Sequence, residues 1–184
     1  LVIVEGLSTH LTEWIATGRV DLGLVLNPEP NPAIEVTPLL DEPLGLVGPA
    51  QVGKTGKQAP IAFAELIKYP LVLPERSHVL RKHLETQAAQ CSLKLDVGLE
   101  VSSVQSILDL VAAGYGYAVL SRTALRASGR PEAFTCRPLT KPTLTSMFFL
   151  AGAAHKPVTP LGRQAFRMLQ ELVVATAKQD GEVV

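Results

Sequence analysis

The sequence contains little cysteine, few aromatic residues and no excess of charge of either sign. Its 184 residues include 2 cysteines, 5% aromatic residues, and 17 Lys plus Arg against 17 Asp plus Glu. Cys91 and Cys136 are too few for a disulfide scaffold or a cysteine-rich zinc site, and they are typical of a reducing cytosol. The formal net charge of +0 gives no sign of a nucleic-acid-binding surface, which usually carries a basic excess.

Long apolar runs are also missing. No run approaches the roughly 18 residues that a membrane-spanning helix needs, and no basic stretch followed by an apolar one marks an export signal. These absences favour a cytoplasmic protein with no membrane partner. The chain begins at Leu1 inside an apolar, strand-like run. We therefore expect an upstream part of the protein to be absent from this sequence.

The apolar content is nevertheless sufficient for a folded core. Hydrophobic residues make up 47% of the chain, charged residues 18%, and the mean hydropathy is +0.24. Disordered chains combine low hydrophobicity with high net charge, so this composition excludes disorder of the whole chain. The length suits one domain or two small lobes that share strands.

Short β-branched runs alternate with amphipathic stretches, a pattern typical of βαβ units around a parallel sheet. The pattern predicts helices at 9–17, 62–67, 79–90, 103–113, 122–128 and 159–177. It predicts strands at 1–5, 20–26, 34–39, 44–48, 71–73, 94–100, 117–120, 134–139 and 145–151. A bend at 41–43 is expected between the third and fourth of these strands. The chain therefore has the element order of an α/β fold.

Two helices carry more specific expectations. Ser102 and Gln105 have the spacing of a capping box at the start of the 103–113 helix, and Gly114 is expected to end it. In the C-terminal helix the apolar residues share one face. We expect that face to point inward with the side chains of Leu161, Ala165, Met168, Leu169, Leu172 and Val173.

A phosphate-loop pattern, G-x-x-x-x-G-K-[ST], is matched letter for letter by the segment from Gly48 to Thr55. In that motif a helix begins at the Lys-Thr pair and supplies much of the field that holds the phosphates. Here Gly56 and Pro60 disfavour such a helix, because glycine is a weak helix former and proline removes a donor. We interpret the segment as a solvated loop, and a nucleotide-binding enzyme stays as the less favoured alternative.

No residue pattern indicates catalysis or metal binding. The four histidines are scattered, and the spacing of His78 and His83 does not place both on one helix face as ligands at i and i+4 would be. A Gly-x-Ser-x-Gly nucleophile elbow is missing. We therefore expect neither an enzyme nor a metal or other cofactor.

Hydroxyl residues are found where predicted strands meet predicted helices: Ser8, Thr9, Ser77, Ser102 and Ser103. Ligands of open α/β sheets bind beyond the carboxyl ends of the strands, where hydroxyl groups and free N–H groups can hold small anions. The alternative is ordinary helix capping, for which Ser and Thr are common with or without a ligand.

The order of elements resembles a known family. The segments Val4-Glu5-Gly6-Leu7-Ser8, Gly18-Arg19-Val20-Asp21-Leu22-Gly23-Leu24 and Leu108-Asp-Leu-Val-Ala-Ala-Gly-Tyr-Gly116 are similar to the effector-binding domain of LysR-type transcriptional regulators. The resemblance extends from Leu1 to about Val174. It also accounts for the Gly-Lys-Thr segment as a variable loop between two strands.

The resemblance implies an α/β fold with two lobes like those of type-2 periplasmic binding proteins, joined by two crossover strands. Lobe I would be residues 1–43 plus 152–184, and lobe II residues 44–151. The first strand and helix of lobe I, and the winged helix-turn-helix domain, would lie upstream. Promoter DNA is therefore expected as a partner only through that missing domain.

The resemblance further implies that a small-molecule effector, often an anion or carboxylate, binds between the lobes of a homodimer or homotetramer. The effector-binding residues that it implies are Ser8, Thr9, Arg76, Ser77, His78, Ser102 and Ser103. Two other interpretations stay open: a solute-binding protein of a transporter, and an interaction module without a ligand.

Overall fold

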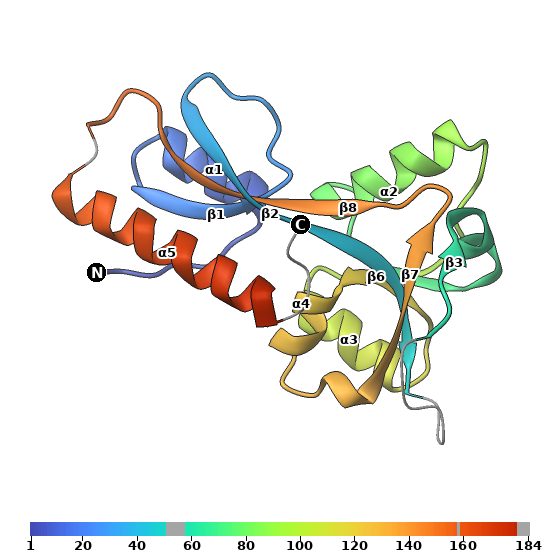
Figure 1. Ribbon diagram of the computed structural model, residues 1–184. Coiled ribbons are helices and arrows are strands. Elements are labelled where there is room, and N and C mark those ends of the chain that lie inside the picture. Colours follow the sequence, from blue (N-terminus) through green and yellow to red (C-terminus); the bar gives the residue numbers. More distant parts are fainter. Residues whose placement is uncertain (51–57, 158, 180–184) are drawn as a thin grey trace. The chain divides into compact units, whose positions relative to one another are not determined.

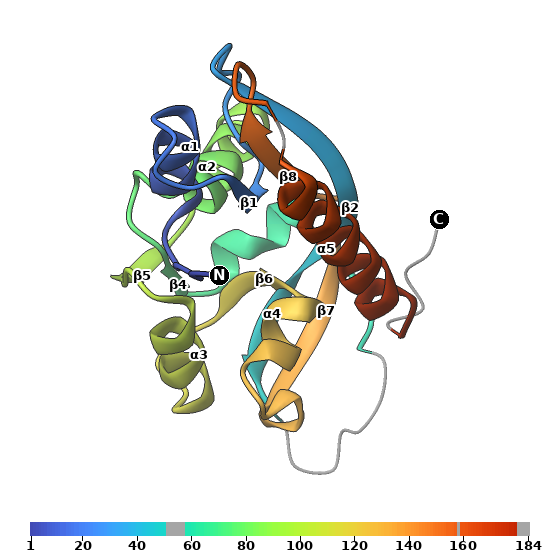
Figure 2. The same cartoon turned by 90° about the vertical axis from the view of Figure 1, so that its left-hand side faces the viewer.

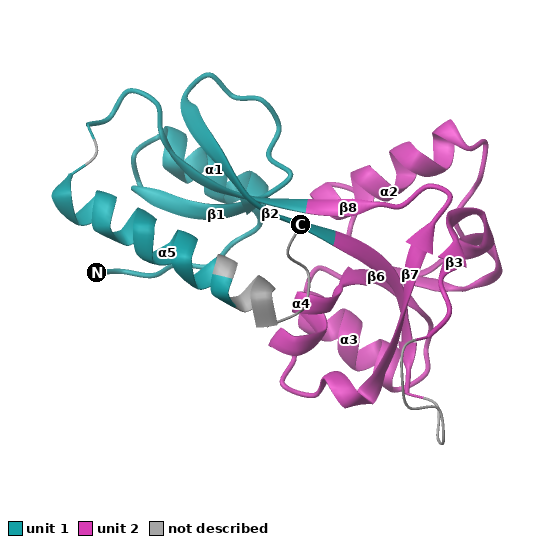
Figure 3. Ribbon diagram, in the orientation of Figure 1, with its two compact units in different colours: residues 1–42, 147–184 teal, residues 43–146 magenta. Residues whose placement is uncertain are grey.

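The computed structural model describes residues 1–50, 58–157 and 159–179. The chain forms two compact units, residues 1–42 with 147–184 (unit 1) and residues 43–146 (unit 2), coloured separately in Figure 3. Each unit is a mixed α/β body with its own hydrophobic core. The Gly53, Lys54 and Thr55 positions of the phosphate-loop pattern lie outside the described residues.

Two strands connect the units along the chain, β2 (Ile34–Pro49) and β8 (Thr145–Ala153). Two strands with a bend at 41–43 were expected in place of β2, and this expectation is wrong, because β2 continues through Pro43. The proline ring holds φ near an extended value, so Pro43 removes one hydrogen-bond donor without ending the strand. The next residue restores hydrogen bonding, since the Leu44 amide donates to the Leu144 carbonyl at 2.8 Å.

Unit 1 contains α1 (Ser8–Ala16), β1 (Leu22–Leu26) and α5 (Pro160–Gln179), besides parts of β2 and β8 (Figure 1). Strand β1 pairs antiparallel with β8, and β8 is the neighbour of β2 in the sheet. Helix α1 ends where Gly18 adopts a φ of 75°, a conformation that costs glycine little. The buried core of this unit consists of Ile15, Val25, Ile34 and Ala151.

The strand expected at residues 1–5 is not present. The segment has no regular secondary structure, and Leu1, Val2 and Ile3 are 104%, 86% and 86% exposed. An apolar run becomes a strand only when a neighbouring strand supplies its hydrogen bonds. Among the described residues, no strand pairs with this segment.

Helix α5, red in Figure 2, has the expected position, but its apolar face is not inward. Of the six residues expected to point inward, Leu161, Met168 and Leu172 are 67%, 54% and 60% exposed, and Ala165, Leu169 and Val173 are half-buried. The helical period shows which side chains share a face, whereas burial requires an opposing surface. The described core of unit 1 contains no residue of α5.

Unit 2 combines part of a six-stranded sheet, a separate two-stranded sheet and helices (Figure 1). In one sheet β2 lies between β6 and β7, and β7 also pairs with β3; the other sheet is the parallel pair of β4 and β5. The elements of the unit are β3 (Ile61–Ala62), the 3-10 helix η1 (Phe63–Lys68), β4 (Leu71–Leu73), α2 (Val79–Gln90), β5 (Val97–Glu100), α3 (Val104–Ala112), β6 (Ala118–Ser121), α4 (Arg122–Ala127), the 3-10 helix η2 (Pro131–Ala133) and β7 (Phe134–Thr140).

The Gly114-Tyr-Gly116 motif joins α3 to β6, and each glycine has its own role. Gly114 has a φ of 82° and ends α3 in a left-handed conformation. A Cβ on Gly116 would lie 2.7 Å from the Pro70 carbonyl oxygen. The motif therefore lets the chain approach β4 closely, and the Val72 amide donates to the Tyr117 carbonyl at 2.7 Å.

Within the described ranges of the chain, no helix is both long enough and apolar enough to cross a bilayer.

Candidate functional site

Two loops of unit 2 lie at one edge of a parallel sheet. Strands β4 and β5 pair with Leu73 opposite Glu100, and beyond this pair the Val101 amide donates to the Leu73 carbonyl at 3.0 Å. Arg76, Ser77 and His78 follow β4, whereas Ser102 and Ser103 follow β5. Because parallel strands have their carboxyl ends at the same edge, the structure brings these five predicted site residues to one place in unit 2.

A buried arginine on α2 binds both loops. Arg81 is 2% exposed, and its Nη1 donates to the Pro74 carbonyl at 3.1 Å, directly after β4. Its Nη2 lies 3.3 Å from Glu100 Oε1 at the end of β5, and its Nε donates to Glu85 Oε1 at 2.8 Å. Arg81 is therefore bonded to the ends of both strands as well as to its own helix.

The loop after β4 leads into α2 through His78. The Nδ1 atom of His78 accepts a hydrogen bond from the Leu80 amide at 3.1 Å, so the imidazole caps the helix. Burial lowers the pKa of His78, and the neighbouring Glu75 carboxylate partly opposes this shift. The neutral ring keeps its Nε2–H as a donor. Ser77 donates to Glu75 Oε1 at 2.9 Å, and Arg76 is exposed.

In the loop after β5, neither serine side chain caps helix α3. The capping box expected from Ser102 and Gln105 is not formed: Ser103 occupies the N-cap position of α3 and its side chain accepts no capping bond. Gln105 instead donates to Asp109 Oδ1 at 3.3 Å. Since Ser102 and Ser103 are both exposed, their hydroxyl groups are available to a ligand.

In unit 1 the predicted residues stand at the start of α1. The N-cap position belongs to Leu7, and Ser8 is the first helical residue. Ser8 Oγ accepts a hydrogen bond from the Leu26 amide at 2.9 Å, which ties α1 to the end of β1. Thr9 is exposed, and its carbonyl accepts a bond from the Thr12 hydroxyl at 2.8 Å. The Ser8 hydroxyl keeps its proton as a donor.

No local pattern in the sequence marks Arg81 and Glu100 as partners, and only the residue type of Asn27 points to its role. The backbone N–H of Asn27 donates to the Met147 carbonyl at 2.9 Å, and the side-chain Oδ1 of Asn27 accepts from the backbone N–H of Met147 at 2.9 Å. Asn27 thus extends the pairing of β1 with β8 by one position, at a φ of 40°. The one sequence signal was its residue type, since asparagine tolerates left-handed backbone.

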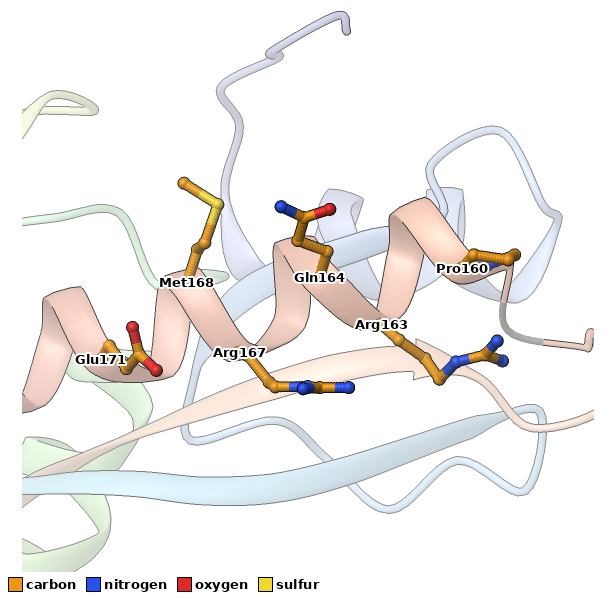
Figure 4. Close-up of a pocket in the computed structure, with 6 residues that line it drawn as sticks. All are labelled: Pro160, Arg163, Gln164, Arg167, Met168 and Glu171. Carbon is orange, nitrogen blue, oxygen red and sulfur yellow. The ribbon is translucent and has the colours of Figure 1, made fainter.

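A surface depression of about 520 Å³ follows α5 (Figure 4). Its lining residues all belong to this helix: Pro160, Arg163, Gln164, Arg167, Met168 and Glu171. Figure 4 shows Gln164 and Met168 on one side of the helix and Arg163 and Arg167 on the other. None of the predicted site residues is among them. A depression lined by a single helix does not enclose a ligand, so it adds no chemistry to the predicted site.

Among the residues that the structure describes, no group of three His, Cys, Asp or Glu side chains is placed to hold a metal ion.

Comparison with known proteins gives the family. Residues 1–173 match the model of the LysR substrate binding domain. The HTH-type transcriptional regulator BbuR of Bordetella bronchiseptica is 31% identical over 120 residues, which are 65% of this chain and 37% of that protein. The chain thus spans less than half the length of this curated relative.

Two solved structures have the same fold. The regulatory domain of CcmR from Synechocystis PCC6803, in complex with 2-PG, gives a TM-score of 0.75 at 19% identity over 91% of this chain and 80% of that chain. The effector binding domain of QuiR, in complex with shikimate, gives a TM-score of 0.74 at 18% identity over 90% of this chain and 77% of that chain. These likenesses confirm the predicted α/β fold class. On the match over residues 1–173, the chain belongs to the LysR substrate binding domain family.

Proposed function

We propose that this chain is the effector-sensing part of a LysR-type transcriptional regulator. In this proposal a small anionic or carboxylate effector binds to residues of both lobes, residues 1–43 plus 152–184 and residues 44–151. Binding favours one conformation by its differential affinity for the two states. The effector thereby controls promoter binding by a winged helix-turn-helix domain elsewhere in a cytoplasmic homodimer or homotetramer.

The observation that carries the proposal is the family match over residues 1–173. The two solved relatives are described in complex with 2-PG and with shikimate, which favours a small ligand for this chain as well. The arrangement in unit 2 agrees with an anionic one. The exposed Arg76 guanidinium and the hydroxyls of Ser102 and Ser103 are donors at the same edge of the β4–β5 sheet.

The alternatives receive less support. The curated relative is a transcriptional regulator, which favours regulation over transport and over catalysis. We therefore propose a sensor that is not itself an enzyme.

The first test is a thermal-shift and calorimetric titration of the 184-residue chain with 2-PG, shikimate, other small carboxylates, inorganic anions and ATP with Mg²⁺. A ligand that binds the folded state raises the unfolding temperature according to its concentration relative to Kd. We expect one small acid to bind. Binding of ATP with Mg²⁺ alone would contradict the proposal.

Variants then locate the site. Ser103→Ala and Arg76→Ala should each weaken the acid that binds, by about tenfold for the charged group. Ser8→Ala should weaken the same acid if both units contribute, and its stability must be measured too because Ser8 also binds the Leu26 amide. Thr86→Ala and Lys94→Ala are matched controls, since both positions are exposed and outside the predicted site.

A further inference from the structure

Unit 2 contains a second recess, separate from the predicted effector residues. It has a volume of about 350 Å³ and is lined by residues of β2 and β7, by Gln58 and Ala59, and by two tyrosines. Small-molecule sites commonly have volumes of this size or larger. Tyr69 precedes β4 and Tyr117 precedes β6, so the recess lies at the amino ends of these strands. The loops with Arg76 and Ser103 lie at the carboxyl ends of β4 and β5.

The strand register places the lining residues on one face of the sheet. Gly48 of β2 is opposite Thr135 of β7, and Leu46 is opposite Arg137. Directly opposed residues of an antiparallel pair point to the same side, as do residues two apart along a strand. The floor of the recess is therefore built from two adjacent strands, which hold its side chains in fixed positions.

An aromatic wall stands on this floor. A Cβ on Gly48 would lie 2.7 Å from Tyr117 Cε1, so only the absence of a side chain at Gly48 lets the Tyr117 ring lie against the strand. The Tyr69 ring meets the Tyr117 ring edge to face, with ring centroids 4.8 Å apart and an interplanar angle of 73°. Both rings are half-buried and offer apolar surface to a planar ligand.

The Arg137 guanidinium supplies the charge of the recess. Its Nε donates to the Ala59 carbonyl at 3.0 Å and its Nη1 to the Tyr69 hydroxyl at 3.1 Å. In the part of the chain that the structure describes, no carboxylate is within ion-pair distance of Arg137. The nearby Glu65 is bonded to Lys68 at 3.2 Å, which is the main reason that the pKa of Glu65 is lowered.

Arg137 and Tyr69 offer donors to the recess, and Gln58, which also lines it, carries an amide NH2 donor beside its acceptor oxygen. The two Nη2 hydrogens of Arg137 are not used by these bonds, and Tyr69, which accepts from Arg137, keeps its own O–H to donate. A half-buried cation with additional donors is complementary to an anion that has two acceptor oxygens, as in bidentate arginine–carboxylate pairs. Phosphate would satisfy the same donors, but it would leave the aromatic wall uncovered.

We propose that this recess binds a small aromatic carboxylate, with the carboxylate on Arg137 and Tyr69 and the ring against Tyr117. The site is independent of the effector site proposed above, because it uses other residues at the opposite end of β4. A second ligand class would then act on the same lobe.

The test is a calorimetric titration of the 184-residue chain with sodium benzoate, and separately with sodium acetate and inorganic phosphate. We expect benzoate to bind more tightly than either. Arg137→Gln should weaken benzoate at least about tenfold, and Tyr69→Phe about threefold, because the first loses a charged hydrogen bond and the second a neutral one. Lys94→Gln removes the same charge from an exposed position and should leave benzoate affinity unchanged.

Urea midpoints of each variant show whether it is folded, and Tyr69→Phe keeps the aromatic ring if Arg137→Gln does not fold. The proposal is wrong if benzoate does not bind, if acetate or phosphate binds as tightly, or if Tyr69→Phe and Arg137→Gln leave the affinity unchanged. Loss of benzoate binding in Ser103→Ala, with retention in Arg137→Gln, would assign benzoate to the effector site and overturn a second site. Benzoate binding that is weakened in Arg137→Gln and Tyr69→Phe, and unchanged in Ser103→Ala, supports the second site whatever the outcome of the effector screen.

Discussion

Arg81 Nη2 lies 3.3 Å from Glu100 Oε1 and joins α2 to the end of β5. The two side chains differ in environment, because Arg81 is 2% and Glu100 47% exposed. The same guanidinium binds the Pro74 carbonyl. One buried side chain therefore holds the two loops that carry the predicted effector residues of unit 2, and its value to the fold can be measured.

Arg81→Met should lower the free energy of unfolding by about 2–3 kcal/mol, because the buried Pro74 carbonyl loses its donor and the side chain loses its ion pairs. Glu100→Gln should cost less than about 1 kcal/mol, since Glu100 is close to half exposed and solvent screens its charge. Urea denaturation measures both. Thr86→Ala on the exposed side of α2 is the control, and a cost below that of Glu100→Gln for Arg81→Met would contradict this role.

The stability of unit 2 should depend on pH through His78. The pKa of His78 in the folded protein is lowered from its ordinary value of 6.5, mainly by burial. The unfolded chain therefore binds the proton more readily, and stability rises with pH across this window. The stabilisation that the neutral His78 imidazole contributes is complete above about pH 6.5 and is lost as the pH falls through the lowered pKa of the folded protein. A protonated Nδ1 also cannot accept from the Leu80 amide.

Urea midpoints at neutral pH and at pH values below the His78 transition would test this dependence. His78→Asn keeps an N-cap acceptor and removes the titrating group. The wild-type chain should lose more stability than His78→Asn on acidification. Equal losses in the two proteins would show that other groups cause the pH dependence.

Gly116→Ala should destabilise unit 2 by about 2 kcal/mol, as expected for added volume in a packed region. The new Cβ would lie 2.7 Å from the Pro70 carbonyl oxygen and 3.0 Å from Val72 Cγ2. A backbone carbonyl cannot move aside as easily as the end of a flexible side chain. A Cβ on Gly98 would have Pro70 Cβ, 3.6 Å away, as its nearest neighbour, so Gly98→Ala should change stability by less than about 0.5 kcal/mol. Thermal unfolding of both variants measures the difference. Equal losses of stability in Gly116→Ala and Gly98→Ala would contradict this prediction.

Local chemistry explains which parts of the fold were predictable. Helix α2 begins and ends where the sequence predicts, at 79 and 90, and α3 differs by one residue at each end. These boundaries depend on the helical period and on neighbouring residues such as Gly114. The family motifs are equally local, which is why the α/β fold and the family could be inferred from their order.

The errors concern features that need a distant partner. The expected strand at 1–5 and the expected inward face of α5 both had the right apolar pattern, but a pattern does not supply the surface that covers it. The expected bend near Pro43 is wrong for a related reason, because Leu44, directly beyond it, pairs with Ser121 of β6 and its amide donates to the Leu144 carbonyl.

The sequence by itself determined most of the order of helices and strands, the turns that glycine makes, and the family to which the chain belongs. These follow from backbone sterics and side-chain periodicity within a few residues. Only the tertiary structure decided that Arg81 meets Glu100, that Ser8 binds the Leu26 amide, and that the Arg137 guanidinium donates to the Tyr69 hydroxyl. Such pairs depend on strand register and on the packing of segments distant along the chain, which no local spacing specifies.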